Sequence, residues 1–205
     1  MKVLLINASP HEKGSTYTAL SQMVTVFEEQ GIETTLMNIG KKAIRGCMAC
    51  GFCGEHGKCV FDDEVNRAAE EFEKSNGLVL ASPVYYASVN ATLCAFCDRL
   101  FHSSPFDKTM KVGAAVVSAR RGGCTAAFDR INKYFSISSM PIASSRYWNQ
   151  IHGNNAEEAL QDKEGLGTMR TLARNMAFLM KSIELGKNAF GIPESEEIIK
   201  TNFIR

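Results

Sequence analysis

The sequence predicts one α/β domain in which a parallel sheet is covered by helices on both faces. The chain has 205 residues, enough for a single domain with its own core. Apolar runs typical of buried strands alternate with helix-like segments, and no repeat, low-complexity stretch or linker interrupts them. We assign the domain to residues 1–186. Residues 187–205 form a tail whose apolar side chains are expected to pack on the body or on another subunit.

The strands follow from short apolar runs and the helices from apolar side chains at helical spacing. Residues 2–8 (KVLLINA) form a nearly continuous apolar run, as expected of a strand buried on both faces. Gly186 is predicted to end the last helix, and HGNNAEE before that helix is interpreted as a polar turn. Strands are expected at residues 2–8, 33–39, 77–82, 111–118 and 141–146. Helices are expected at residues 15–30, 62–74, 88–101, 124–134 and 167–185.

Composition and charge exclude several classes of protein. Apolar residues make up 45% and charged residues 22%, as in an ordinary globular protein. A net charge of +1 gives no electrostatic footprint for nucleic acid or an anionic membrane. The first apolar run is too short for a signal peptide, and no run is long enough to span a membrane. An odd count of seven cysteines without an export signal indicates a reducing cytoplasm.

The loop after the first strand, NASPHEKGST, has the features of a phosphate site. It lacks the glycine-rich motifs of dinucleotide and triphosphate sites. Instead it offers the hydroxyls of Ser9, Ser15 and Thr16, with Gly14 permitting a tight turn where a helix begins. Backbone N–H groups and the helix dipole attract a phosphate monoester there. His11 is either a further donor or a solvated side chain, and the hydroxyls can alternatively serve as simple helix caps.

Loops after the third and fourth strands should meet this one, because ligands of doubly wound sheets bind at the carboxyl edge between strands one and three. The loop after strand three offers backbone donors and acceptors with two aromatic rings, which suits a flat, polar-edged heterocycle. Paired glycines after strand four let the backbone approach a ring closely. Arg120 or Arg121 favours an anionic ring or is solvated surface charge. The candidate residues are Pro83, Val84, Tyr85, Tyr86, Ser118, Arg120, Gly122 and Gly123.

A compact loop at residues 46–60 carries four cysteines with the spacing C-x2-C-x2-C-x5-C. Four thiolates from one loop favour a cubane iron–sulfur cluster. A zinc ion, which usually takes ligands from two separate knuckles, and metal-free redox cysteines are the alternatives. A second C-x-x-C at Cys94 and Cys97 lies in mid-helix and is interpreted as buried core. The four candidate ligands are Cys47, Cys50, Cys53 and Cys59.

These motifs, together with SPVYYASVNATLCAFCDR, resemble the flavodoxin-like NAD(P)H-dependent FMN reductases and, more narrowly, the iron–sulfur flavoproteins. The resemblance implies a three-layer flavodoxin-like fold with a five-stranded parallel sheet in the order 2-1-3-4-5. It implies FMN with its phosphate held by Ser9, Ser15 and Thr16, and with its ring lined by residues 83–86 and 122–123. It further implies that the four cysteines ligate one 4Fe–4S cluster.

The function implied by the resemblance is an FMN-dependent oxidoreductase. Hydride from NAD(P)H, or electrons from ferredoxin, would reach FMN, and the cluster would pass single electrons to a small-molecule or protein acceptor. No catalytic side chain is assigned, since the chemistry takes place at flavin N5. A homodimer or homotetramer is expected. The alternatives are an NAD(P)H-dependent FMN or quinone reductase without a cluster, a flavin electron carrier without substrate turnover, and a zinc-stabilised interaction protein.

Overall fold

The computed structural model of the chain describes residues 1–197, 199–201 and 203. Among them, no helix is both long and apolar enough to cross a membrane. The elements are, in chain order, β1 (Lys2–Asn7), α1 (Ser15–Glu29), β2 (Glu33–Asn38), α2 (Phe52–His56), α3 (Glu64–Glu73), β3 (Gly77–Tyr85), β4 (Ser88–Val89), α4 (Ala91–Ser103), β5 (Val112–Ala119), α5 (Cys124–Ser136), β6 (Gln150–His152), α6 (Ala156–Ala159) and α7 (Lys163–Phe190).

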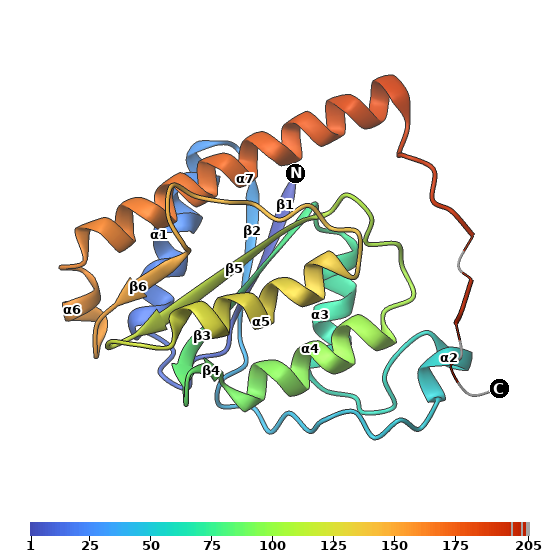
Figure 1. Cartoon of the computed structure of the whole chain (residues 1–205), viewed down its shortest axis with the longest axis horizontal. Helices are drawn as coiled ribbons and strands as arrows, with labels where there is room; N and C mark the ends of the chain where they lie inside the picture. The colour runs from blue at the N-terminus through green and yellow to red at the C-terminus, as the bar shows by residue number, and fades with distance from the viewer. Residues whose placement is uncertain (198, 202, 204–205) are drawn as a thin grey trace.

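Five strands form a parallel sheet in the order β2-β1-β3-β5-β6, which is the expected order along the sheet. A sixth strand, β4, has two residues and pairs antiparallel with the end of β3. Helices α1 and α7 cover one face of the sheet, and α3, α4 and α5 cover the other (Figure 1). The predicted three-layer α/β fold is therefore confirmed. The strand order reverses between β1 and β3, which opens a crevice at their carboxyl ends.

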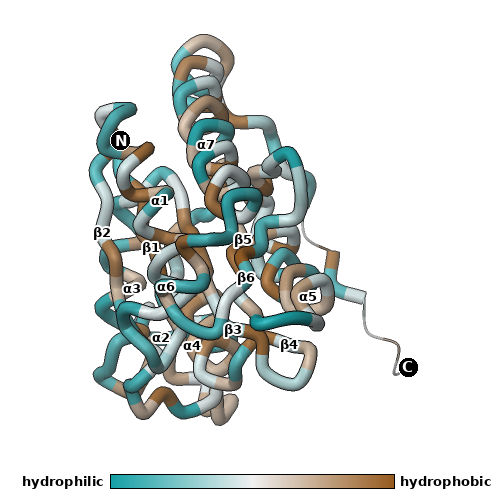
Figure 2. The backbone as a smooth tube through the Cα atoms, turned by 90° about the vertical axis from the view of Figure 1, so that its left-hand side faces the viewer, coloured by the Kyte–Doolittle hydropathy of each residue, from teal (hydrophilic) through white to brown (hydrophobic). Residues whose placement is uncertain are grey.

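The sheet separates two apolar cores because successive side chains of a strand point to opposite faces. On β1, Val3 and Leu5 pack with α1 and α7, whereas Leu4 and Ile6 pack with α3, α4 and α5. All four side chains are fully buried, which explains why the strand is apolar throughout. Figure 2 shows the hydrophobic stretches gathered in the strands between the two helical layers.

The fifth strand was predicted too early, at residues 141–146. Ile142 makes a single bridge with Gly113, after which the chain leaves the sheet and returns only at β6. The side-chain amide of Asn149 donates to the Ala115 carbonyl at 2.9 Å and replaces a backbone donor at the return. The intervening residues 146–148 are exposed. The position of the fifth strand therefore depends on where the chain pairs with β5, and no local sequence pattern indicates that pairing.

The last helix is longer than predicted at both ends. It continues through Gly186, where a side chain would meet no neighbour, and ends at Phe190, with Gly191 as the C-cap at a φ of +79°. The predicted end at Gly186 is therefore wrong. Phe190 at the end of α7, and Ile199 and Phe203 beyond it, are almost fully exposed. Ile198 and Ile204 lie outside the described residues, and packing of the tail on another subunit stays a prediction.

Candidate functional site

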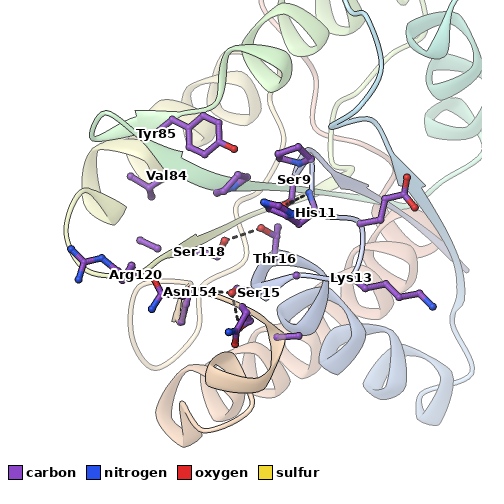
Figure 3. Close-up of a pocket in the computed structure, with 18 of the residues that line it drawn as sticks. Ser9, His11, Lys13, Ser15, Thr16, Val84, Tyr85, Ser118, Arg120 and Asn154 are labelled. Carbon is purple, nitrogen blue, oxygen red and sulfur yellow. Dashed lines mark hydrogen bonds between the residues drawn. The ribbon is translucent and has the colours of Figure 1, made fainter.

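A cleft of about 630 Å³ opens at the carboxyl edge of the sheet, within the size range of small-molecule sites. Its walls come from the carboxyl ends of β3 and β5, from the loops that follow β1, β2, β5 and β6, and from the first turns of α1 and α6 (Figure 3). Parallel strands all end at this edge, so four loops that are distant in sequence meet there.

Ten of the thirteen candidate ligand residues line this cleft. The three that do not line it are Tyr86, whose side chain is fully exposed, Gly122 and Gly123. The ten residues are Ser9, His11, Gly14, Ser15, Thr16, Pro83, Val84, Tyr85, Ser118 and Arg120.

The first turn of α1 offers free backbone donors to the cleft. Gly14 occupies the N-cap position and supplies no side-chain cap, and the first turn carries no acidic residue. Within the described part of the chain, no protein acceptor takes the N–H groups of Ser15, Thr16 or Tyr17. Lys13 and Lys41 line the cleft as well. A helix start with unused donors is suited to an anion such as a phosphate.

The hydroxyls of this loop already have protein partners. Ser15 Oγ donates toward the carbonyls of Gly153 and Asn155, at 3.0 Å each. Thr16 Oγ1 and Ser118 Oγ lie 2.7 Å apart and are buried (Figure 3). These contacts tie the loop to β5 and to the loop after β6. Their first role is therefore to fix the loop's shape, and the unused backbone N–H groups remain for a ligand.

Asn7 shapes the loop after β1, although no pattern in the sequence singles it out. Its buried side chain accepts from the Ser9 N–H at 3.0 Å and donates to the Glu12 carbonyl at 3.3 Å. The amide also donates to Asn38 on the neighbouring strand at 2.9 Å. The Asn7 side chain therefore pairs with two backbone groups in the turn of the loop and anchors the loop to β2.

The loop after β3 is a hairpin, not the start of a helix. Tyr86 and Ala87 both have positive φ, 49° and 58°, as the central residues of a type I′ turn require. Gly123 supports this hairpin from behind. Its φ is +97°, and a Cβ there would lie 2.8 Å from the Ala87 Cα. The predicted helix accordingly begins at Ala91, three residues later than expected.

The loop after β6 is the part of the cleft that the sequence prediction missed. Gly153, Asn154 and Asn155 line the cleft together with the first residues of α6. Lys41, which follows β2, and Lys13 line it as well. Because the fifth strand was placed at residues 141–146, HGNNAEE did not follow a strand end. The rule that located the other loops would have found it if β6 had been placed correctly.

All four cysteines of the compact loop line a second pocket. Met48, Val60, Phe61 and residues of α4 complete its wall. Cys47 and Cys50 are exposed, whereas Cys53 and Cys59 are half-buried. Ala49, Gly51 and Gly57 adopt positive φ, which folds the loop tightly. The predicted ligands are therefore brought to one place.

The cysteine pocket is not arranged for a single metal ion. Among the described residues, no three His, Cys, Asp or Glu side chains stand close enough to hold one ion. The cavity measures only about 20 Å³, room for roughly one water molecule. The hydroxyl of Ser103 on its wall is buried without a hydrogen-bond partner. A cluster binds each thiolate at a different iron, so its four sulfurs stand further apart than the ligands of one ion.

The remaining cysteines, Cys94, Cys97 and Cys124, are half-buried or buried. Burial raises the pKa of the Cys97 thiol well above its ordinary value, with the nearby Cys94 and Asp98 adding to the effect. Burial likewise raises the pKa of Cys94 and of Cys124. A thiol whose ionisation is suppressed is a poor nucleophile and a poor metal ligand. The second C-x-x-C therefore belongs to the core, with Cys97 fully buried.

The fold, with its cleft at the carboxyl edge of the parallel sheet, is that of a flavodoxin-like α/β protein. The sequence profile of the NADPH-dependent FMN reductase family matches residues 1–154. The chain belongs to this family and, within it, to the iron–sulfur flavoprotein type, and it is thus an FMN-binding oxidoreductase.

Two relatives and two solved structures show the extent of the likeness. The chain is 31% identical to an iron-sulfur flavoprotein of Methanocaldococcus jannaschii over 90% of this chain and 100% of that one. It is 28% identical to an iron-sulfur flavoprotein of Methanosarcina thermophila over 92% of this chain and 100% of that one. RosB bound to 8-demethyl-8-formylriboflavin-5'-phosphate superposes with a TM-score of 0.69 at 14% identity, covering 100% of this chain and 92% of that one. An archaeal flavodoxin superposes with a TM-score of 0.61 at 14% identity, covering 88% and 99%.

Proposed function

We propose that this protein exchanges electrons between FMN in the cleft and a 4Fe–4S cluster held by Cys47, Cys50, Cys53 and Cys59. The observation that carries the proposal is the uncapped first turn of α1 at the cleft, with a loop of four cysteines gathered at a second pocket. NAD(P)H or a reduced ferredoxin is the proposed donor, and a small molecule or a protein is the acceptor.

The phosphate end of FMN fits the start of α1. The N–H groups of Ser15 and Thr16 would donate to phosphate oxygens, and the helix dipole adds to the attraction. Lys13 and Lys41 would balance the charge of the monoester. The hydrogen bonds from Ser15 to the loop after β6 hold these donors in place before any ligand arrives.

The ring end of FMN fits the loops after β3 and β5. Pro83, Val84 and Tyr85 supply an apolar wall, and Arg120 places a positive charge on the opposite side of the cleft (Figure 3). Bound FMN would supply hydride acceptance and the release of single electrons, chemistry that no side chain of this cleft provides. The role of the side chains is to orient the ring and to exclude water from it.

The cysteine pocket fits a cluster better than it fits one ion. Four thiols line one cavity and all belong to one loop, as compact iron–sulfur motifs require. The exposed Cys47 and Cys50 would have to move outward, since the cavity itself is small. The orphaned Ser103 hydroxyl would gain an acceptor in a sulfur of the cluster.

A homodimer or homotetramer is part of the proposal. The cleft and the cysteine pocket share no lining residue. Helix α2 of the cysteine loop and helix α6 of the cleft lie at opposite sides of the molecule in Figure 1. A second subunit that brings its cluster toward the cleft would shorten the distance for electron transfer.

Anaerobic purification followed by spectroscopy tests the proposal. We expect flavin absorption bands above a broad absorbance that dithionite bleaches, with about four iron and four sulfide per chain. NAD(P)H or reduced ferredoxin should bleach the flavin bands. Zinc in place of iron would contradict the cluster, and a folded sample that binds no FMN would contradict the assignment of the cleft.

A reductase without a cluster is the second candidate. It is favoured by one observation: the cavity between the four cysteines measures only about 20 Å³ and would have to open before a cluster could bind. Iron and sulfide analysis separates the two candidates. Full NAD(P)H-dependent turnover by anaerobically purified protein that contains FMN but no iron would identify this second function.

A further inference from the structure

The most deeply buried charged side chain of the described chain lies behind the cysteine loop. Arg99 projects from α4 and its side chain is only 1% exposed. A guanidinium is buried in proteins only when its charge and its donors are compensated, because its desolvation is costly. The partners of Arg99 therefore indicate what the burial achieves.

All five N–H donors of Arg99 have acceptors. Asp63 accepts two of them in a bidentate pair, at 2.7 Å and 2.9 Å, and balances the charge. The carbonyl of Arg45 accepts at 3.3 Å and that of Phe61 at 3.4 Å. The remaining donor, Nε–H, points to the Sγ of Cys59 at 3.2 Å. An arginine side chain has five N–H donors, so no donor of Arg99 is left without an acceptor.

These partners lie at both ends of the cysteine loop. Arg45 precedes the first cysteine by two residues, and Phe61 follows the last cysteine by two residues. One rigid guanidinium therefore joins the two ends of the loop to each other and to α4. The N-cap of α3 is attached to the same group, because Asp63 Oδ1 also accepts from the Val65 N–H at 3.0 Å.

Cys59 is the most firmly held of the four cysteines. Besides the contact of its sulfur with Arg99, its N–H donates to Asn66 Oδ1 at 3.0 Å, and its carbonyl accepts from Asn66 Nδ2 at 3.0 Å. Cys47 and Cys50, by contrast, are exposed. The loop thus has one side that is held by hydrogen bonds to α3 and α4 and one side that is exposed.

We propose that Arg99 is the positioning residue of the cysteine site: it sets the Cys59 sulfur and both ends of the loop before iron binds, and it donates a hydrogen bond to that thiolate in the loaded protein. The proposal rests on the cluster proposed above. Hydrogen bonds to cluster sulfurs raise the reduction potential by stabilising the added electron, and outer partners of this kind commonly affect affinity by roughly 10- to 100-fold.

Arg99→Lys tests the proposal, because a lysine keeps the charge but loses the planar fork that spans several acceptors. The control is Arg67→Lys, the same change on α3 at a side chain that is 69% exposed. Full-length proteins are purified anaerobically, and iron, sulfide and FMN content and the midpoint potentials of cluster and flavin are measured. We expect Arg99→Lys to keep FMN, to bind iron roughly 10- to 100-fold more weakly and to show a lower cluster potential. The control should match the wild type in all of these.

A second variant, Asp63→Asn, keeps an oxygen for the cap of α3 but leaves the charge of Arg99 unbalanced. We expect the cluster potential to shift upward in this variant, opposite to Arg99→Lys. Wild-type iron content and potential in Arg99→Lys would overturn the proposal. So would loss of FMN together with iron in both variants, since that result assigns Arg99 to the stability of the whole fold. A wild type that binds no iron would instead overturn the cluster itself.

Discussion

Gly40 offers a sharp test of how the loop after β1, the proposed phosphate loop of residues 8–14, is held. It follows β2 and lies against the loop after β1. A Cβ built on Gly40 would stand 2.1 Å from the Ser9 carbonyl oxygen, 2.2 Å from the Ser9 carbonyl carbon and 2.5 Å from the Pro10 nitrogen. These are backbone atoms, so no flexible side chain can move aside. Gly40→Ala must therefore displace the phosphate loop.

The size of the effect follows from the overlap. Cβ atoms essentially never approach other heavy atoms within 3.0 Å, so the loop must retreat by about 1 Å. Inserting a methyl group into a well-packed site typically costs about 1–3 kcal/mol. The same loop leads into the first turn of α1, where the N–H groups of Ser15 and Thr16 lie. If most of this cost appears on binding, the affinity for FMN falls roughly 5- to 150-fold.

The assay is titration of FMN into apoprotein, followed by quenching of flavin fluorescence, with thermal unfolding recorded in parallel. Gly186→Ala is the matched control, because nothing lies within 4 Å of that position on α7. Alanine is favoured over glycine in a helix by about 1 kcal/mol, so the control should raise the melting temperature and leave affinity unchanged. An unaltered affinity for FMN in folded Gly40→Ala would refute the account of the loop.

Three further predictions concern the loop, the charge of the cleft and the core. Ser15→Ala removes the hydrogen bond to Gly153 and should lower the free energy of unfolding by about 1 kcal/mol, measured by urea denaturation. Lys41→Ala should weaken FMN binding roughly 2- to 5-fold at low salt, and the difference should vanish near 0.5 M salt in the same titration. Cys97 has a raised pKa in the folded state, so above about pH 9 only the unfolded chain ionises this thiol and stability falls with rising pH. In Cys97→Ala, the slope of unfolding free energy against pH should therefore be less steep by up to about 1.4 kcal/mol per pH unit.

Each of these has an outcome that would contradict it. Unchanged stability of Ser15→Ala would mean that the link to the loop after β6 contributes nothing. A salt-independent loss in Lys41→Ala would point to packing and not to charge. Val79→Ala is the control for Cys97→Ala, since it also removes buried side-chain volume but changes no ionisable group. An equal alkaline slope in Cys97→Ala and in the wild type would remove this thiol from the pH dependence.

Local patterns predicted most of the scaffold. A continuous apolar run marks β1, and apolar side chains at helical spacing mark α1. The ends of both elements were therefore predicted to within one or two residues. The loops after β1, β3 and β5 were located for the same reason. The loop after β6 was missed because a three-residue strand at a sheet edge has almost no apolar signal of its own.

Residue types at short spacing were enough to predict the alternation of strands and helices, the serine loop at the start of α1 and the run of four cysteines. Three contacts could be seen only in the folded chain: the hydroxyl of Ser15 faces the loop after β6, Gly40 lies against the backbone of Ser9, and Arg99 lies behind Cys59. Each of these contacts joins segments far apart in the chain. No local pattern encodes which distant backbone a side chain will meet.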